Sequence, residues 1–462
     1  MINSKKTVIV GGGIAGLFTA LVLERQDGAE HLILVDKNKI GGLFNCHEYS
    51  DYGKFDIGTH ILSESGDTEI DHILEFFYSS DKWKALVGNK RDLSGTISNG
   101  MIKTATAAID FSYLPARIID EIVQELIIVS QTFKDEEYTN ISDYIGNKFG
   151  LKLKALILPI IENLFGKKAE ELSSFAANFL PVSRVNLISD INYFNHLMIL
   201  YPKLRNVLAY PNQRSIPVEY TSQNKCYYPH EIGVDLFVEN IKSYMIMKGL
   251  DIIEGGNVKI EKIENGKINK IDINGIVVNV EKIIWSAGLI PYAFFTDVKI
   301  DFSLLDRPKK IVIHHFVLSE ELSCEDCFYL YDLDVNSPIY RVTAYQNFTN
   351  ANCNYGVKIS VEEISNSEMN LEEVRDRIIE KLKVSNLISE KAKIIFSDSK
   401  PIESGFPIPS IKNIEYFEKL RSKLSELYSN CTLVGLNSSP KLFFYRDILK
   451  DVLNKVNMMT KK

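Results

Sequence analysis

The 462-residue chain has few of the features that mark secreted, membrane-spanning or nucleic-acid-binding proteins. Its six cysteines are too sparse for a disulfide framework, so we expect a reducing, cytoplasmic setting. Lysine and arginine number 53 against 60 for aspartate and glutamate, and this small acidic excess gives no support to nucleic-acid binding. Apart from a glycine-interrupted N-terminal stretch, the chain has no apolar run of about eighteen residues. No transmembrane segment is therefore predicted, and peripheral contact with a membrane stays an open alternative.

Two patterns imitate functional motifs, but each lacks an essential part. Lys5 and Lys6 before the uncharged run 7–23 imitate a signal peptide, yet three adjacent glycines interrupt the run and no small-residue cleavage site ends it. Cys324 and Cys327 have the Cys-x-x-Cys spacing of metal and redox sites, but no second pair accompanies them. We therefore expect neither an export signal nor a metal site.

What the chain does contain is typical of a globular protein with a sizeable core. Hydrophobic residues make up 45% of the sequence and charged residues 24%. A length of 462 residues favours two or three domains. Because no internal repeat or low-complexity linker separates them, a chain that crosses repeatedly between two domains fits best.

The stretch from Thr7 to Asp36 has the pattern of one βαβ unit. A β-branched run, a glycine-rich turn, an apolar helical segment and a second apolar run follow one another. Gly11, Gly13 and Gly16 fill the glycine positions of the dinucleotide fingerprint, which allow a tight turn, close approach of a pyrophosphate and close helix–strand packing. Asp36, twenty residues after Gly16, ends the second run, where a carboxylate can accept hydrogen bonds from ribose hydroxyls. The stretch therefore predicts a dinucleotide-binding domain.

Glycines further along the chain suit the same kind of ligand. The pair Gly41-Gly42 follows a basic turn, and Gly58 interrupts a short strand-like segment. Glycines at such positions let the backbone pass close to a large flat molecule. The alternative is that both segments are ordinary turns.

Hairpin, helical and strand signals divide the rest of the chain. An Asn-Gly turn predicts a hairpin over 97–102, and residues 113–215 are mostly helical in pattern. Two further Asn-Gly turns predict a three-stranded meander over 258–280, followed by a separate buried strand over 282–285. Further strands are expected at 310–318, 329–332, 339–345, 357–361 and 432–435, and helices at 234–248, 371–383 and 447–456.

The order of these segments resembles that of FAD-dependent amine oxidases. The resemblance is carried by Gly11–Asp36, Gly41-Gly42, Asp56–His60, the meander after Val258, Ile284–Gly288 and the strand ending at Gly435. Within that group the chain is similar to protoporphyrinogen-oxidase-like proteins and to the related UDP-galactopyranose mutase. The resemblance implies an α/β fold: a discontinuous Rossmann-like FAD-binding domain with a three-stranded β-meander, and a second domain of mixed sheet and helical insertion. The expected FAD-binding domain comprises residues 1–75, 222–296 and 400–462, and the substrate domain 76–221 and 297–399, with the helical insertion at 113–215.

The resemblance implies FAD, held non-covalently because no cysteine lies where covalent amine oxidases carry theirs. The pyrophosphate would lie against Gly11, Gly13, Ala15 and Gly16, and the adenosine ribose against Asp36. Ile14 and Lys37 are further expected cofactor-binding residues. Gly42 and Leu43 would lie along the diphosphate and ribityl chain, and the backbone of Val258 would pair with adenine. The isoalloxazine ring would be approached by Gly58, Thr59 and His60. Gly435, with Asp447 and Ile448, would cover the pyrimidine side of the cofactor and its ribityl chain.

For the reaction, the resemblance implies hydride transfer from a small organic substrate to flavin N5, the chemistry of an FAD-dependent oxidoreductase. His60 is the expected catalytic group beside the ring, and a histidine with a purely structural partner is the alternative. Arg341 is expected either to bind a substrate anion through its bidentate fork or to form a surface salt bridge. Two other functions stay open, namely a non-redox nucleotide-sugar mutase and a flavin-binding protein without turnover. The substrate is a small molecule in either enzyme, and the chain could form an oligomer.

Overall fold

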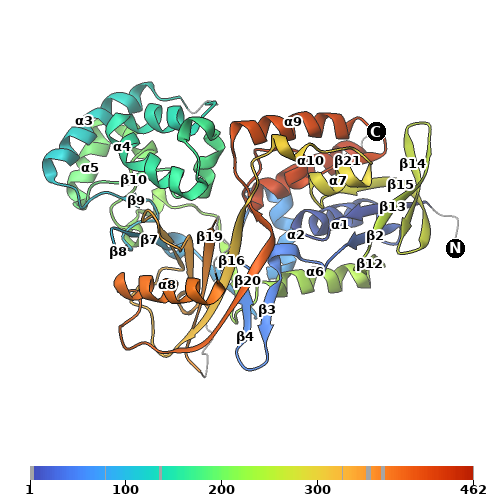
Figure 1. Ribbon diagram of the computed structural model, residues 1–462, viewed down its shortest axis with the longest axis horizontal. Helices are drawn as coiled ribbons and strands as arrows, with labels where there is room; N and C mark the ends of the chain where they lie inside the picture. Colours follow the sequence, from blue (N-terminus) through green and yellow to red (C-terminus); the bar gives the residue numbers. More distant parts are fainter. Residues whose placement is uncertain are drawn as a thin grey trace.

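The computed structural model describes residues 5–78, 80–134, 138–324, 326–349, 355–365 and 370–460. Figure 1 shows a parallel sheet with its helices on one side of the molecule, and a second sheet beneath a cluster of helices on the other. None of the helices in these ranges combines the length and the apolar character that a membrane crossing requires.

The first βαβ unit forms as its sequence predicts. Strand β1 (Lys6–Val10) and strand β2 (Leu32–Asp36) are buried along nearly their whole length, as the β-branched and leucine-rich runs require of central strands. Helix α1 (Ile14–Asp27) is buried from Ala15 to Leu23. It is apolar on nearly all sides because the sheet covers one face and helices α6 (Asp235–Met247) and α10 (Tyr445–Thr460) pack against it from others.

Five parallel strands form the nucleotide-binding sheet. Strands β12 (Asp251–Glu254), β15 (Ile276–Trp285) and β21 (Cys431–Leu433) extend the first unit in the spatial order β12-β2-β1-β15-β21. Numbered along the chain these strands are in the order 3-2-1-4-5, in which the connection changes direction between β1 and β15. Open sheets of this type bind ligands beyond the carboxyl ends of the strands at that switch point.

The meander is joined directly to this sheet. Strands β13 (Val258–Glu264) and β14 (Lys267–Ile273) are linked by Asn265-Gly266, whose positive φ values suit a type I′ turn. The prediction of a separate strand over 282–285 was wrong. The third strand of the meander continues without a break to Trp285 as β15, and its first half pairs with β14 while its second half pairs with β1 and β21.

The second sheet has the order β20-β16-β19-β18-β17-β7-β8 and is antiparallel except where β17 meets β7. Its strands are β7 (Ser94–Ser98), β8 (Met101–Lys103), β16 (Lys309–Leu318), β17 (Tyr329–Asp332), β18 (Arg341–Ala344), β19 (Val357–Ser365) and β20 (Ile394–Phe406). Strand β20 crosses residue 400, the predicted boundary between the substrate domain and the FAD-binding domain. The second sheet therefore continues into the segment predicted to belong to the FAD-binding domain.

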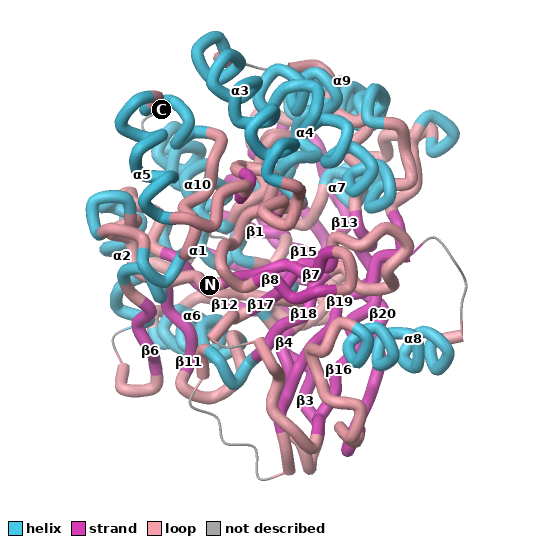
Figure 2. Tube along the Cα trace, turned by 90° about the vertical axis from the view of Figure 1, so that its left-hand side faces the viewer, coloured by secondary structure: helices cyan, strands magenta, loops and turns pink. Residues whose placement is uncertain are grey.

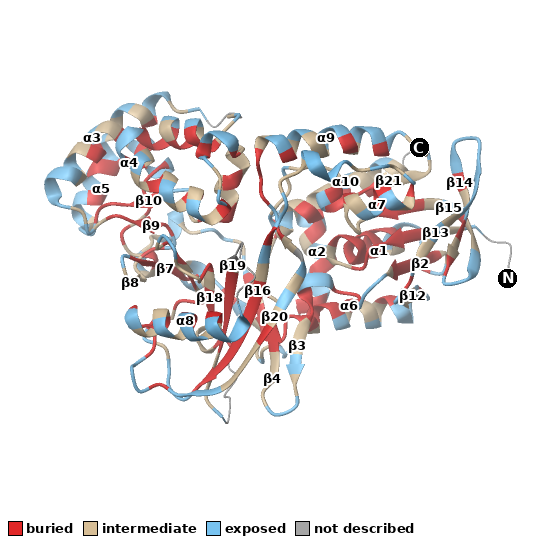
Figure 3. Ribbon diagram, in the orientation of Figure 1, coloured by how far each residue is buried: buried red, intermediate tan, exposed pale blue. Residues whose placement is uncertain are grey.

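The two faces of the second sheet differ in polarity. One face is mostly apolar and packs against helix α8 (Leu371–Val384). Figure 2 shows α8 beside this sheet, and Figure 3 shows that its inner strands are buried. Strand register places polar side chains in two rows on the other face. The rows are Tyr331, Arg341 and Glu362, and Tyr329, Thr343, Ser360 and His315.

The predicted helical insertion is a separate cluster with its own core. It consists of α3 (Ala116–Thr132), α4 (Ile141–Phe165) and α5 (Ile191–Leu200). Helix α4 is interrupted at Gly150, which has a positive φ of 81°. Tyr340 joins this cluster to the second sheet by donating a hydrogen bond of 2.5 Å to the Phe179 carbonyl.

The described residues form further strands and helices around these layers. They are β3 (Cys46–Tyr49), β4 (Gly53–Asp56), β5 (Leu62–Ser63), β6 (Trp83–Leu86), β9 (Ile109–Asp110), β10 (Val185–Asn186), β11 (Cys226–Pro229), α2 (Thr68–Tyr78), α7 (Leu289–Phe295) and α9 (Ile411–Ser425). The hairpin β3–β4 projects beside β16 and β20 at the lower edge of Figure 1.

Candidate cofactor and active site

Two of the fingerprint glycines are required by packing between backbones. A Cβ atom on Gly11 would lie 2.5 Å from Ser286 Oγ and 2.6 Å from the Ala287 nitrogen, at a φ of 105° that side chains rarely adopt. A Cβ atom on Gly16 would lie 1.8 Å from the Gly11 carbonyl oxygen. These positions let β1, β15 and α1 approach one another, as the fingerprint predicts.

Gly13 differs from its neighbours because it faces open space. Its backbone is extended, with φ −71° and ψ −174°, and a Cβ atom there would meet nothing within 4 Å. Around it, a Cβ on Gly42 would lie 3.4 Å from Gly13 Cα, and one on Gly435 would lie 2.8 Å from Ala15 Cβ. Three segments far apart in sequence thus present bare backbone at the N-terminus of α1. We call Gly13, Gly42 and Gly435, with Ala15, the glycine cradle.

The cradle fits a pyrophosphate. The first N–H groups of α1 have no partner within the helix, and the helix dipole places partial positive charge there. Both features favour an anion at this helix end. The dinucleotide that the sequence predicts therefore has a suitable place at the switch point of the sheet.

Asp36 lies at the same edge, but its carboxylate already has backbone partners. Its Oδ2 accepts from the Gly12 N–H at 2.6 Å, and its Oδ1 accepts from the Asn38 N–H at 2.7 Å. A carboxylate oxygen can accept more than one hydrogen bond, so a role toward ribose stays a prediction. Lys37 is exposed in the following turn. Val258 lies nearby, because the Gly256 N–H donates to the Asp36 carbonyl at 2.8 Å.

The predicted C-terminal residues also reach the cradle. The Gly435 N–H donates to Asp451 Oδ2 at 2.9 Å, and a Cβ on Gly435 would lie 3.5 Å from Ile448 Cγ2. Asp447 is in the first turn of α10, while Ile14 begins α1. Leu43, next to Gly42, is half exposed. The structure thus brings together the residues that the sequence distributes over four distant segments.

His60 lies after β4, between the cradle and the second sheet. Its ring stacks on Phe44 with 4.7 Å between centroids, and Nε2 lies 2.9 Å from the Ile57 carbonyl. A carbonyl only accepts, so Nε2 carries the proton and Nδ1 keeps a free lone pair. Burial, aided by the charge of Arg341, lowers the pKa of His60 to about 4. His60 is therefore a neutral hydrogen-bond acceptor at pH 7.

We expect the His60 ring to stay neutral down to about pH 5 and to titrate near the lowered pKa of about 4. Nitrogen-15 NMR of histidine-labelled protein measures this directly. Because the folded pKa lies below the ordinary 6.5, acid favours the unfolded state through this group. The free energy of unfolding of the wild type should therefore fall relative to that of His60→Gln as the pH falls from 6.5 towards 4. Titration of the folded ring near 6.5 would contradict the assignment.

Arg341 forms a buried ion pair, which excludes the surface salt bridge. Its Nε donates to Glu362 Oε1 at 2.7 Å and its Nη2 to Oε2 at 3.0 Å. Burial alone would lower the pKa of Arg341, but the charge and hydrogen bonds of Glu362, together with Tyr331 and Tyr340, outweigh burial and the pKa lies well above its ordinary value. Three tyrosine rings surround the guanidinium at 5.7 to 5.9 Å, namely Tyr329, Tyr331 and Tyr340. We call these five residues the arginine cage.

The arginine cage and His60 meet at Gly58. A Cβ atom on Gly58 would lie 3.7 Å from Glu362 Oε1 and 3.7 Å from His60 Nε2. One residue further, the hydroxyl of Thr59 forms a hydrogen bond with that of Thr343. Segment 57–60 therefore lies along the polar face of the second sheet.

The sequence analysis missed Glu362, Thr343 and the three tyrosines. A signal for them was present, because alternation along the run 357–365 places Glu362 and Ser360 on one face. What the sequence does not contain is the register that sets Arg341 opposite Glu362. Pairing between strands distant along the chain is not encoded in either strand alone.

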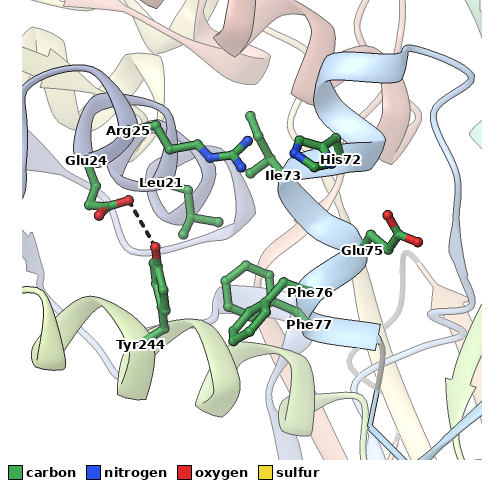
Figure 4. A pocket seen from close by; sticks show the side chains of 9 residues that line it. All are labelled: Leu21, Glu24, Arg25, His72, Ile73, Glu75, Phe76, Phe77 and Tyr244. Carbon is green, nitrogen blue, oxygen red and sulfur yellow. Dashed lines mark hydrogen bonds between the residues drawn. The ribbon is translucent and has the colours of Figure 1, made fainter.

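A groove of about 500 Å³ lies elsewhere on the nucleotide-binding domain. Figure 4 shows its aromatic wall, formed by Phe76, Phe77 and Tyr244, and the hydrogen bond between Tyr244 and Glu24. Its Leu21 lies about 12 Å along α1 from Gly13, since each helical residue rises 1.5 Å. The groove is therefore not part of the glycine cradle.

Solved structures of similar fold cover nearly the whole chain. Reduced UDP-galactopyranose mutase matches 99% of this chain and 96% of its own, with a TM-score of 0.75 and 16% identity. A putative protoporphyrinogen oxidase from Exiguobacterium sp. 255-15 matches 100% of this chain and 99% of its own, with a TM-score of 0.67 and 13% identity. The chain has the same overall fold as these two proteins. Putrescine oxidase bound to putrescine has it too, with 99% of each chain covered, a TM-score of 0.60 and 13% identity.

This shared fold confirms the predicted fold class and the predicted resemblance. Residues 9–77 match the family described as an NAD(P)-binding Rossmann-like domain. Over 69 residues the chain is 35% identical to an uncharacterized protein in the nifH2 3′ region of Methanothermococcus thermolithotrophicus. That match covers 15% of this chain and 65% of the relative, less than two thirds of the relative's length.

Proposed function

We propose that this protein binds FAD without a covalent link and oxidises a small organic substrate. The observation that carries the proposal is the glycine cradle at the switch point, with His60 and the arginine cage beside it. Gly13, Ala15 and the α1 N-terminus would hold the pyrophosphate, and Asp36 the adenosine ribose. Bound FAD would supply a hydride acceptor.

The residues on the polar face would bind and orient the substrate. Neutral His60 offers Nδ1 as a hydrogen-bond acceptor or as a base for a substrate proton. Thr59 and Thr343 hold segment 57–60 against the sheet. Arg341 is balanced by Glu362, so the face carries little net charge there. A neutral or singly charged substrate, such as an amine entering in its neutral form, fits this balance best.

A nucleotide-sugar mutase is the second candidate. It is favoured by the overlay on UDP-galactopyranose mutase, whose TM-score of 0.75 exceeds those of the oxidases reported above. The charge balance argues in the other direction. A diphosphate needs cations, and the guanidinium of Arg341 is already paired with a carboxylate.

Absorption spectroscopy of the purified protein tests cofactor and reaction together. We expect a yellow protein that releases FAD on denaturation and bleaches anaerobically with one of a panel of small amines. Turnover of UDP-galactopyranose only after dithionite reduction, with no bleaching by any amine, would favour the mutase. A colourless protein that cannot be reconstituted with FAD would contradict both proposals.

A further inference from the structure

A chain of hydrogen bonds runs from the half-buried hairpin β3–β4 into the core beside the candidate site. His47 Nδ1 lies 2.8 Å from His315 Nε2, and His315 Nδ1 lies 2.9 Å from Ser360 Oγ. Ser360 Oγ lies 2.9 Å from the Tyr345 hydroxyl. The Tyr345 oxygen accepts a hydrogen bond of 3.0 Å from the Asp56 N–H. His315, Ser360 and Tyr345 are at most 1% exposed, whereas His47 is partly accessible. We call these five residues the histidine chain.

The direction of every bond in the chain follows from its inner end. An amide N–H can only donate, so the Tyr345 oxygen accepts from Asp56. The proton of the buried Tyr345 hydroxyl then needs an acceptor, which is Ser360 Oγ. Ser360 in turn donates to His315 Nδ1, and His315 donates from Nε2 to His47 Nδ1. Both histidines must therefore be neutral, with the proton on Nε2.

A proton on His47 Nδ1 is incompatible with this arrangement. It would set two N–H donors against each other across 2.8 Å. The groups around the pair do not favour two charged rings either, because burial lowers the pKa of His315 to about 3 and that of His47 below its ordinary value. Several charged and titratable groups face the two rings. They are Tyr49 on β3, Lys358 on β19, and the pair Asp398 and Lys400 on β20. His314 on β16 and Glu363 on β19 lie behind them.

The inner end of the histidine chain is one residue before segment 57–60. The Asp56 carboxylate is fixed separately, since it accepts from the Tyr228 hydroxyl at 2.5 Å and from the Val234 N–H at 2.9 Å. The backbone N–H of Asp56 depends on Tyr345. A change at His47 therefore has a defined route to the backbone that leads into Gly58 and His60.

We infer that His47, His315, Ser360 and Tyr345 act as positioning residues. They hold the Asp56 N–H, and with it the start of segment 57–60, only while His47 is neutral. The observation is the oriented, unbranched series of bonds that links an accessible imidazole to that backbone N–H. The inference reaches beyond the proposed function, because it concerns the protein chain alone.

The first test is the tautomer of each ring in the full-length protein. Long-range nitrogen-15 NMR spectra of histidine-labelled protein at about pH 7.5 distinguish a protonated Nδ1 from a protonated Nε2. We expect the proton on Nε2 in both His47 and His315. A protonated Nδ1 on His315 would reverse the direction of the bonds and overturn the inference.

The second test measures hydrogen exchange of the Asp56 amide between about pH 5 and pH 8. After correction for the intrinsic exchange rate, protection of the Asp56 amide in the wild type should fall by about fivefold as His47 takes up a proton. About fivefold is the factor expected for the loss of one hydrogen bond. His47→Gln should stay protected throughout, because its amide oxygen accepts from His315 without titrating. His47→Leu should have the low protection at every pH.

His72→Gln is the matched control, since His72 is an exposed histidine on α2 outside the chain. It should behave as the wild type does. Protection that is independent of pH in the wild type, or equal in His47→Gln and His47→Leu, would overturn the inference. Neither measurement involves FAD, so a negative result would leave the proposed function as it stands.

Discussion

Replacing Gly13 by valine is expected to leave the protein folded but to weaken its affinity for FAD by at least about a hundredfold, or about 2.7 kcal/mol. The backbone of Gly13 is extended, and a Cβ atom there meets nothing within 4 Å, so the folded chain can accept a side chain. The valine methyl groups would instead occupy the space in which the pyrophosphate approaches the backbone. Fluorescence titration of the apoprotein with FAD measures the affinity, and circular dichroism measures the fold.

Gly16→Ala gives the opposite pattern and serves as the comparison. Its Cβ would overlap the Gly11 carbonyl oxygen at 1.8 Å, so α1 and β1 would have to separate. We expect loss of stability before any specific effect on FAD can be measured. Unchanged FAD affinity in Gly13→Val would show that the cradle does not hold the pyrophosphate.

Glu362→Gln is expected to destabilise the protein by about 3–5 kcal/mol, the range found when one partner of a buried ion pair is removed. Glu362 is 4% exposed, and the guanidinium of Arg341 would stay charged without its partner. Arg341→Met should destabilise the protein by a similar amount, because it leaves the carboxylate of Glu362 buried without its cation. Urea unfolding followed by far-UV circular dichroism measures both variants.

The double variant Arg341→Met/Glu362→Gln separates this explanation from simple loss of packing. With both charges removed, the total loss should be clearly smaller than the sum of the two single losses. Glu121→Gln is the matched control, because it breaks the exposed pair with Lys152 and should change stability by less than about 1 kcal/mol. Additive losses at Arg341 and Glu362 would contradict a coupled pair.

Much of the nucleotide-binding edge could be predicted because its signals are local. Gly16 is demanded by its contact with Gly11 within one βαβ unit, and the Asn-Gly turns fix the meander over two adjacent hairpins. The resemblance to a known family supplied the positions that lie far from the fingerprint, such as Gly435. No local rule connects that residue with Ala15, which its Cβ would meet at 2.8 Å.

The active-site face could be predicted only in part, because it depends on register. Arg341 and His60 are visible in the sequence as single residues, but Glu362 becomes their neighbour only when β18 and β19 pair. The same limit applies to β15, whose two halves look like two separate strands in the sequence. They form one continuous strand, and each half pairs with a different partner. Tertiary context decides such cases.

The route of the chain also has a consequence for biosynthesis. Gly435 and Ile448 complete the cradle that Gly13 and Ala15 begin, and Gln26 donates to Asn457 at 2.8 Å across more than four hundred residues. Chains are made from the N-terminus, and distant pairings form slowly. The part of the apolar surface of α1 that α10 covers must therefore stay uncovered on the ribosome until nearly all of the polypeptide has emerged. A nascent chain arrested before residue 430 should consequently be bound by chaperones and should fail to retain FAD.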